Sequence, residues 1–322
     1  MKALLFDGRA GDRGQLRLVD NRASPLPAPG EARIRTTVVG ICNTDLEIVR
    51  GYAGFRGVLG HEFVGVVEEA EDPALVGQRV VGEINAYCGS CDTCRAGRPT
   101  HCPNRTTLGI RRRDGALAEF LCLPVRNLHR VPEALSDVAA VFTEPLAAAC
   151  EVLYQIQVQP TDRVLVLGDG KLGLLVAQVL ALTGCDLTAV GRHEDKLAIL
   201  AARGIRTQLE GEGPDGGADL VVECTGHAGG FAAARKLVRP RGTLVLKSTY
   251  HDRVQVDLSS VVTDEVQLVG SRCGPFAPAL RLLAKGLVDV TSLIEAEYPL
   301  SEGLAAFEHA SRRGALKVLV RP

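Results

Sequence analysis

The chain has 322 residues, of which 46% are hydrophobic and 23% charged, and its formal net charge is −1. This length allows two domains that bury about three quarters of the unfolded surface. The small net charge provides no overall field for nucleic acid or an anionic membrane. No apolar run approaches the ~18 residues of a membrane span, and Asp7 interrupts the N-terminus too early for a signal peptide. We therefore expect a cytoplasmic protein without nucleic-acid or membrane partners.

The first part of the chain is rich in short strand patterns. Glycine and proline separate runs of alternating or apolar residues at positions 32–38, 64–68, 79–81 and 117–121. Such runs, bounded by turn residues, are typical of small all-β units. They predict a compact β-barrel-like domain.

A candidate catalytic cluster is spread over three of these segments. It consists of a cysteine in Gly-Ile-Cys-Asn-Thr-Asp, a histidine and a glutamate in Gly-His-Glu-Phe-Val-Gly, and a glutamate in Thr-Glu-Pro-Leu, namely Cys42, His61, Glu62 and Glu144. Taken singly, each has an ordinary interpretation as a buried thiol, a core histidine or a solvated carboxylate. Together, a thiolate, an imidazole and carboxylates form a mixed zinc site that keeps a position free for water or substrate.

Four further cysteines lie within fifteen residues, in the spacing C-x2-C-x2-C-x7-C: Cys88, Cys91, Cys94 and Cys102. Two-residue gaps let a looping backbone direct successive sulfurs toward one Zn²⁺ ion, and four ligands close the coordination sphere. The sequence therefore predicts a structural zinc. The alternatives are a pair of disulfides or a redox-active Cys-x-x-Cys motif.

The second half of the chain carries a nucleotide-binding pattern. An apolar run at 163–167 is followed at once by Gly-Asp-Gly-Lys-Leu-Gly and then by a helical pattern. At such a strand-to-helix turn a pyrophosphate can approach backbone N–H groups and the helix N-terminus. The expected contacts are Gly168, Gly170, Lys171, Leu172 and Gly173. Further strand patterns at 187–190, 220–223, 243–247 and 266–269 predict an α/β doubly wound parallel sheet.

The end of the second strand of this sheet bears on the choice of coenzyme. An acidic residue there would bind the ribose 2′-hydroxyl of NAD, but the sequence has Gly191, Arg192 and His193. A small residue followed by a guanidinium suits a 2′-phosphate, and Lys196 adds charge nearby. The sequence therefore favours NADP(H) over NAD(H). The alternative is that Arg192 is a solvated side chain.

In their order along the chain, these motifs resemble those of the zinc-dependent medium-chain dehydrogenases/reductases of the alcohol dehydrogenase superfamily, especially the sorbitol and threonine dehydrogenase branch. The resemblance implies a GroES-like catalytic domain at 1–146 and 275–322, with the structural zinc lobe at about 88–102, and a Rossmann domain at 147–274. It also implies a homodimer or homotetramer.

The resemblance assigns roles to individual residues. Cys42, His61 and Glu62 would be ligands of a catalytic zinc, Glu144 would bind it directly or through water, and Asp45 would orient the site. Near the nicotinamide ribose it places Cys224, Thr225 and Gly226 as backbone contacts.

The expected activity is reversible hydride transfer between a secondary alcohol, polyol or amino alcohol and NAD(P), with zinc as the Lewis acid. Thr44 is the candidate proton relay, whereas Glu47 stands where relatives often have a histidine. Two alternatives stay open: a zinc-free quinone or enoyl reductase of the same superfamily, and a non-catalytic nucleotide or redox sensor.

Overall fold

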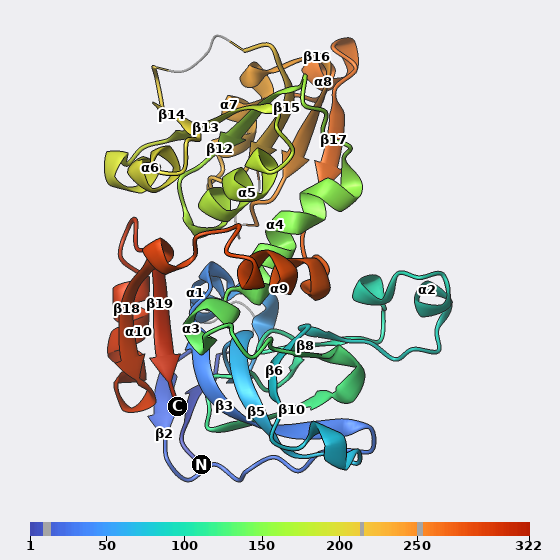
Figure 1. Cartoon of the computed structure of the whole chain (residues 1–322), viewed down its shortest axis with the longest axis vertical. Coiled ribbons are helices and arrows are strands. Elements are labelled where there is room, and N and C mark those ends of the chain that lie inside the picture. Colours follow the sequence, from blue (N-terminus) through green and yellow to red (C-terminus); the bar gives the residue numbers. More distant parts are fainter. Residues whose placement is uncertain (9–13, 213–215, 250–253) are drawn as a thin grey trace. The chain divides into compact units, whose positions relative to one another are not determined.

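The computed structural model describes residues 1–8, 14–212, 216–249 and 254–322. The chain forms two compact units, which Figure 1 shows coloured along the sequence. The first contains Met1–Glu144 and Ala279–Pro322, and the second contains Pro145–Pro278. These limits differ by a few residues from the boundaries expected at 146 and 275.

The first unit is built around a seven-stranded sheet. Its strand order is β11-β6-β5-β3-β19-β18, with β10 also paired to β3. The strands are β3 (Glu31–Gly40), β5 (Glu62–Glu69), β6 (Arg79–Gly82), β10 (Phe120–Pro124), β11 (Leu128–Arg130), β18 (Ile294–Pro299) and β19 (Lys317–Arg321). Because β19 pairs antiparallel with β3, a strand from the last part of the sequence lies in the same sheet as strands from the first part.

The long strand β3 illustrates why the sequence forms this sheet. Its residues Ala32, Ile34, Thr36 and Val38 are buried, while most of the side chains between them are partly or fully exposed. A period of two is the pattern of a strand with one covered face. The core of the unit therefore lies on that face of β3.

Two smaller sheets and four helices lie wholly within the described residues of the first unit. One sheet has the order β2-β1-β4, and the other has the order β7-β8-β9. These strands are β1 (Ala3–Phe6), β2 (Leu16–Val19), β4 (Gly57–Val58), β7 (Asn85–Ala86), β8 (Thr106–Leu108) and β9 (Arg112–Arg113). The helices are α1 (Asn43–Val49), α2 (Asp92–Arg95), α3 (Asp137–Ala140) and α10 (Gly303–Ala310). Helices α4 (Thr143–Gln155) and α9 (Phe276–Ala284) run across the unit boundaries.

The second unit is a six-stranded parallel sheet in the order β14-β13-β12-β15-β16-β17 (Figure 1). Its strands are β12 (Arg163–Leu167), β13 (Asp186–Gly191), β14 (Arg206–Leu209), β15 (Ala218–Glu223), β16 (Val238–Leu246) and β17 (Gln267–Gly270). In chain order the sheet grows from β12 first to one side and then to the other, which is the 3-2-1-4-5-6 order of dinucleotide-binding folds. The predicted doubly wound sheet is confirmed.

Helices cover this sheet because its strands are apolar on both faces. They are α5 (Lys171–Ala181), α6 (Glu194–Ala201), α7 (Gly230–Leu237) and α8 (Leu258–Thr263). Right-handed crossovers in the two directions from β12 place α5 and α6 on one face and α7 on the other. Strand β12 and helix α7 meet in a core that includes Leu165, Val221, Phe231, Ala234 and Leu244.

Candidate metal centres and coenzyme-binding turn

The pairing of β3 with β5 brings the candidate catalytic residues together. Gly40, at the end of β3, is the partner of Glu62, at the start of β5. Cys42 follows two residues after Gly40, and His61 directly precedes Glu62. Consequently one ligand atom each from Cys42, His61 and Glu62 lies within 4.8 Å of the others.

Asp45 holds two of the three segments in place. Its fully buried carboxylate accepts hydrogen bonds from the backbone N–H of Cys42 at 2.9 Å and from that of Gly60 at 3.1 Å. The same carboxylate lies 3.2 Å from Nδ1 of His61, although Nδ1 is misaligned for a hydrogen bond. Asp45 therefore fixes the cysteine and histidine segments around one point, as expected for a residue that orients metal ligands.

The cluster has a negative electrostatic potential that favours a cation. Burial lowers the pKa of His61, but the charges of Asp45 and Cys42 outweigh it and raise that pKa well above its ordinary value. A field that favours a proton on the imidazole also favours a metal ion on the same nitrogen.

Glu62 has two oxygens in different situations. One oxygen pairs with the ammonium of Lys317, and both side chains are buried. The other, Oε1, is buried and has no hydrogen-bond partner among the described residues. A buried carboxylate oxygen needs a partner, and a metal ion between Cys42 and His61 would supply it. The donor set therefore fits a zinc ion.

Lys317 comes from β19, on the opposite side of β3 from β5. Burial lowers the pKa of its ammonium, but the carboxylate of Glu62 and the thiolate of Cys42 outweigh this effect and raise it. A side chain at Gly40 would collide with this pair, since its Cβ would lie 2.4 Å from Oε2 of Glu62 and 3.2 Å from Cδ of Lys317. Glycine is therefore required where the three strands meet.

The other residues predicted for this site lie around the cluster. The carboxylate of Glu144 is close enough to Lys317 to contribute to raising its pKa, but it is not part of the group of ligand atoms within 4.8 Å. Oγ1 of Thr44 lies 3.7 Å from Sγ of Cys42. Glu47 forms an ion pair with Arg50 at 2.6 Å on helix α1.

The four closely spaced cysteines form a second cluster in the excursion between β7 and β8. Their Sγ atoms lie 3.5–4.0 Å apart, in the pairs 88–94, 91–94, 91–102 and 88–102. A tetrahedron with Zn–S bonds of about 2.3 Å has sulfurs about 3.8 Å apart, whereas disulfide sulfurs are about 2 Å apart. The arrangement fits a zinc ion and none of the four is in a disulfide.

The surroundings of this second cluster favour the thiolate at Cys88 and the protonated thiol at Cys94. Backbone N–H groups of Ser90 and Cys91 lower the pKa of Cys88 to about 5. Burial, followed by the neighbouring Cys91, raises the pKa of Cys94 to about 12. Sulfurs this close together cannot all lose their protons without strong repulsion between the thiolates. A divalent cation would offset that repulsion, because the thiolate is the form of cysteine that binds metal.

The glycine-rich turn lies between β12 and α5, as predicted. Gly168 has a φ of +118°, and Cβ atoms at Gly168 and Gly173 would collide with backbone atoms at 2.7 and 2.0 Å. By contrast, a Cβ at Gly170 would meet nothing within 4 Å. Two glycines thus close the turn while the exposed middle one leaves the backbone open, which fits the approach of a pyrophosphate.

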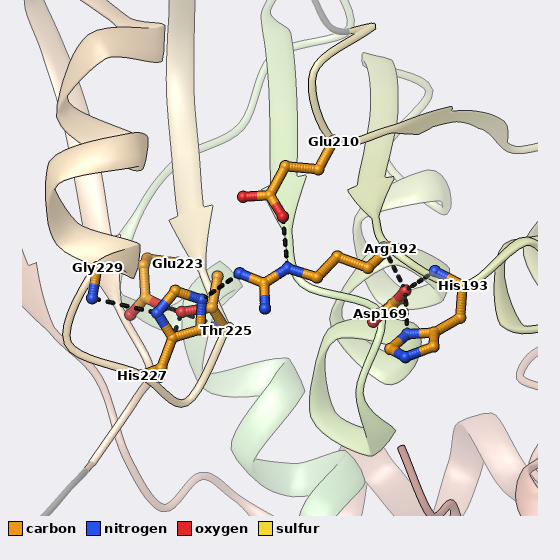
Figure 2. A network of polar contacts seen from close by, with 8 residues as sticks. All are labelled: Asp169, Arg192, His193, Glu210, Glu223, Thr225, His227 and Gly229. Carbon is orange, nitrogen blue, oxygen red and sulfur yellow. Dashed lines mark hydrogen bonds and ion pairs between the residues drawn. The ribbon is translucent and has the colours of Figure 1, made fainter. Parts of the chain in front are cut away.

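The loop after β13 is held by a network of polar contacts (Figure 2). The guanidinium of Arg192 forms an ion pair with Glu210, and its Nη2 lies 2.6 Å from Nε2 of His227. The backbone N–H groups of Arg192 and His193 donate to Oδ2 of Asp169 at 2.6 and 2.7 Å. Lys196 is buried in the first turn of α6.

The predicted backbone contacts after β15 lie in a hydrogen-bonded loop. The N–H of Cys224 donates to the carbonyl of Leu167, which places the ends of β12 and β15 side by side. The N–H and hydroxyl of Thr225 donate to the buried carboxylate of Glu223 at 2.7 and 2.6 Å. Gly226 has a φ of +72° and donates to Oγ of Ser248.

Two residues of these sites were not predicted from the sequence. Lys317 is the first residue of the strand Lys-Val-Leu-Val-Arg, and a lysine that begins an apolar strand is the only signal it gives. Asp169 occupies a variable position of the glycine motif, and nothing in the sequence pattern shows that its side chain reaches the next strand.

Comparison with known proteins agrees with this architecture. Residues 28–133 match the family model of the alcohol dehydrogenase GroES-like domain, and residues 172–285 match that of the zinc-binding dehydrogenases. The sorbitol dehydrogenase of Halalkalibacterium halodurans is 30% identical over 94% of this chain and 95% of its own length.

Two solved structures are similar over their whole length. An alcohol dehydrogenase from Escherichia coli CFT073, in complex with NADH, has a TM-score of 0.89 and 27% identity, covering 100% of this chain and 99% of that one. A protein from Sinorhizobium meliloti 1021 described as a zinc-binding dehydrogenase, bound to NADP, has a TM-score of 0.86 and 28% identity, covering 99% of this chain and 100% of that one.

A GroES-like unit and a Rossmann sheet, with converging thiol, imidazole and carboxylate groups, define a dehydrogenase. The chain belongs to the zinc-binding alcohol dehydrogenases of the medium-chain dehydrogenase/reductase superfamily. The family and the fold class inferred from the sequence motifs are confirmed.

Proposed function

We propose that the chain is a zinc-dependent dehydrogenase that transfers a hydride between a secondary alcohol, polyol or amino alcohol and a nicotinamide coenzyme. The observation that carries the proposal is the convergence of Cys42, His61 and Glu62, with a buried Glu62 oxygen that lacks a partner among the described residues. Similarity to a sorbitol dehydrogenase supports a polyol.

The proposed site needs a metal ion and a coenzyme, and each has a defined task. When bound, Zn²⁺ supplies a Lewis acid that makes an alcohol more acidic, and the nicotinamide accepts the hydride. Cys42, His61 and Glu62 would hold the metal, while Cys88, Cys91, Cys94 and Cys102 would hold a second, structural zinc.

The chain's own residues then orient the ligands and move the proton. Asp45 fixes Cys42 and Gly60 through its two backbone hydrogen bonds. Lys317 holds one oxygen of Glu62, and the other is buried without a hydrogen-bond partner among the described residues, which leaves it for the metal. The hydroxyl of Thr44, beside Cys42, is the proposed acceptor of the alcohol proton, because a threonine hydroxyl can accept one proton while donating another.

Glu144 is proposed to act on the same metal from a greater distance. It lies outside the compact group of ligand atoms but influences Lys317. The sequence left it open whether Glu144 binds the zinc directly or through water. The position of Glu144 outside the compact group supports binding through a water molecule.

The coenzyme is proposed to bind at the turn of Gly168, Gly170 and Gly173, where the backbone is open at Gly170. Similar structures hold NADH in one case and NADP in another. The preference for NADP(H) drawn from the sequence stays a prediction.

Assembly and location are proposed from the family and the fold. Strand β17 pairs only with β16 among the described strands, and its Leu268 is 39% exposed, so its free edge supports a homodimer or homotetramer. No helix among the described residues is long and apolar enough to cross a membrane. A cytoplasmic location is proposed on the sequence alone.

The proposal is tested by screening secondary alcohols, polyols and amino alcohols with NAD⁺ and NADP⁺, on protein whose zinc content has been measured. Zinc-dependent turnover of one of these classes is expected, and removal of zinc should abolish it. Reduction of a quinone or enoyl substrate by metal-free protein would instead support a zinc-free reductase. Coenzyme binding without turnover of any alcohol would support a sensor.

A further inference from the structure

The side chain of Asp169 leaves the glycine-rich turn and reaches the end of β13 (Figure 2). Its Oδ2 accepts hydrogen bonds from the backbone N–H groups of Arg192 and His193 at 2.6 and 2.7 Å, and it lies 3.0 Å from Nδ1 of His193. The side chain is only 10% exposed. A carboxylate is therefore built into the loop that follows the second strand of the sheet.

Gly191 is explained by this carboxylate. A Cβ at Gly191 would lie 2.5 Å from Cβ of Asp169 and 2.6 Å from its Oδ2, so only glycine fits beside it. The space freed by the absent side chain at the end of β13 is thus filled by Asp169. The sequence favoured NADP(H) because a small residue and a guanidinium stand at this position and no carboxylate does, but the fold brings the carboxylate of Asp169 to it.

Hydrogen bonding keeps Asp169 negatively charged. Burial raises the pKa of its carboxyl group, but the N–H groups of His193 and Arg192 outweigh burial and lower it below the ordinary value. All three contacts of the carboxylate are made by Oδ2, and Oδ1 has no hydrogen-bond partner in the described part of the chain. One oxygen of an ionised group is therefore available to a hydroxyl donor.

The guanidinium that would have bound a phosphate is already engaged. Arg192 pairs with the carboxylate of Glu210 on one side and contacts the ring of His227 on the other. A 2′-phosphate bound by Arg192 would share the guanidinium with the carboxylate of Glu210 and would add a second negative group to the loop that holds Asp169. Like charges at such short range repel, and the repulsion is strongest where water is partly excluded.

We infer that Asp169 selects NAD(H) over NADP(H), because its free oxygen accepts a hydrogen bond from the adenosine ribose and its charge rejects a 2′-phosphate. In many NAD-binding folds an acidic residue at the end of the second strand binds this ribose. Here the strand ends in Gly191, and the acid is supplied by the glycine-rich turn instead. The inference rests on the proposed function only in that a nicotinamide coenzyme binds this sheet.

The test compares coenzyme binding by isothermal titration calorimetry, without any alcohol present. NADH is expected to bind the wild-type protein at least about tenfold more tightly than NADPH, the effect of one charged hydrogen bond. In Asp169→Asn, which keeps the shape but removes the charge, NADH binding should weaken and the preference should shrink about tenfold or more.

Asp219→Asn is the matched control. The Asp219 carboxylate accepts the backbone N–H of Arg163 at 2.8 Å and a hydrogen bond from Arg239, and it lies near the opposite, amino-terminal ends of the same parallel strands. This variant should keep the wild-type ratio of the two affinities.

Tighter binding of NADPH by the wild-type protein would overturn the inference, and so would an unchanged ratio in folded Asp169→Asn. If that variant does not fold, the wild-type ratio alone decides. Failure of both coenzymes to bind would overturn the proposed function together with the inference, whereas binding without alcohol turnover would leave the inference standing.

Discussion

At the scale of single residues, the candidate catalytic site is a balance of buried charges. Cys42, Glu62 and Asp45 supply negative charge, and the buried ammonium of Lys317 pairs directly with Glu62 and interacts with the charge of Cys42. A buried charge is tolerated only when it is paired and hydrogen-bonded. Lys317 balances one oxygen of Glu62, which leaves the thiolate and the second oxygen for a metal ion.

Replacing a ligand should abolish turnover without unfolding the protein. In Cys42→Ser or His61→Ala we expect alcohol oxidation to fall at least about a thousandfold, because Lewis-acid catalysis contributes several kcal/mol. The measurement is steady-state turnover alongside circular dichroism. Cys122→Ser is the control, since Cys122 is a free thiol in β10 outside both clusters. Wild-type turnover in Cys42→Ser would contradict the assignment.

Removing the ammonium of Lys317 should destabilise the zinc-free protein. Lys317→Met leaves the carboxylate of Glu62 buried without its partner, and breaking such a pair costs about 3–5 kcal/mol. Added zinc should recover part of this loss because the ion pairs with the same carboxylate. Denaturant unfolding with chelator and with zinc measures both effects, and Lys317→Arg should retain most of the stability. Equal losses with and without zinc would show that Glu62 does not contact the metal.

At the scale of secondary-structure elements, apolar periodicity located most of the strands. The buried strands β12, β13 and β15 lie where continuous apolar runs predicted them, since strands covered on both faces carry such runs. Strand β14, Arg-Thr-Gln-Leu, was missed because it is a partly exposed edge strand with no apolar pattern. The strand expected at 117–121 begins at Phe120, and residue 118 contributes only an isolated bridge to Ala3.

The candidate sites were predictable where function requires particular residue types. The cysteine, histidine and glutamate motifs marked the two clusters that could hold a metal ion, and the glycine motif marked the turn. The positions of Lys317 and Asp169 depend on strand register and on one side chain reaching across to another strand, which residue patterns do not encode. For the same reason the ion pair of Arg192 with Glu210 was not predicted, because it exists only in the folded loop.

The four-cysteine lobe should depend on metal for its stability. Cys91→Ser removes a sulfur that lies 3.5 Å from Cys94 and 3.7 Å from Cys102. We expect it to lose the structural zinc and to lower the melting temperature, because structural zinc sites contribute directly to folding. Zinc analysis and thermal unfolding check both results. Retention of full zinc content in Cys91→Ser would contradict the four-sulfur site.

The loop around Asp169 should contribute stability that depends on pH. The pKa of Asp169 is lowered on folding from its ordinary value of 3.8, so the carboxylate stabilises the folded state above that value. This contribution is lost as the pH falls through the lower, folded pKa. The difference in unfolding free energy between wild type and Asp169→Asn should therefore be largest near neutrality and shrink in acid. Exposed Asp20→Asn is the control, and a difference independent of pH would contradict the account.

At the scale of the whole molecule, the chain combines a unit that gathers the candidate metal ligands with a unit that carries the glycine-rich turn. The first unit is assembled from both ends of the sequence, and the parallel sheet occupies the stretch between them. The domain boundaries expected from the family differ from those of the compact units by a few residues, because α4 and α9 continue across the junctions. The order of the motifs indicates which segments form each unit. It does not locate a junction that falls inside a continuous helix such as α4 or α9.

The most direct test of the account is a crystal of the zinc-loaded protein measured at the zinc absorption edge. We predict anomalous density among Cys42, His61 and Glu62, with an oxygen of Glu62 in contact with the ion, and separate density among the four cysteines. Density at the four cysteines alone, from protein that oxidises an alcohol, would contradict the central claim.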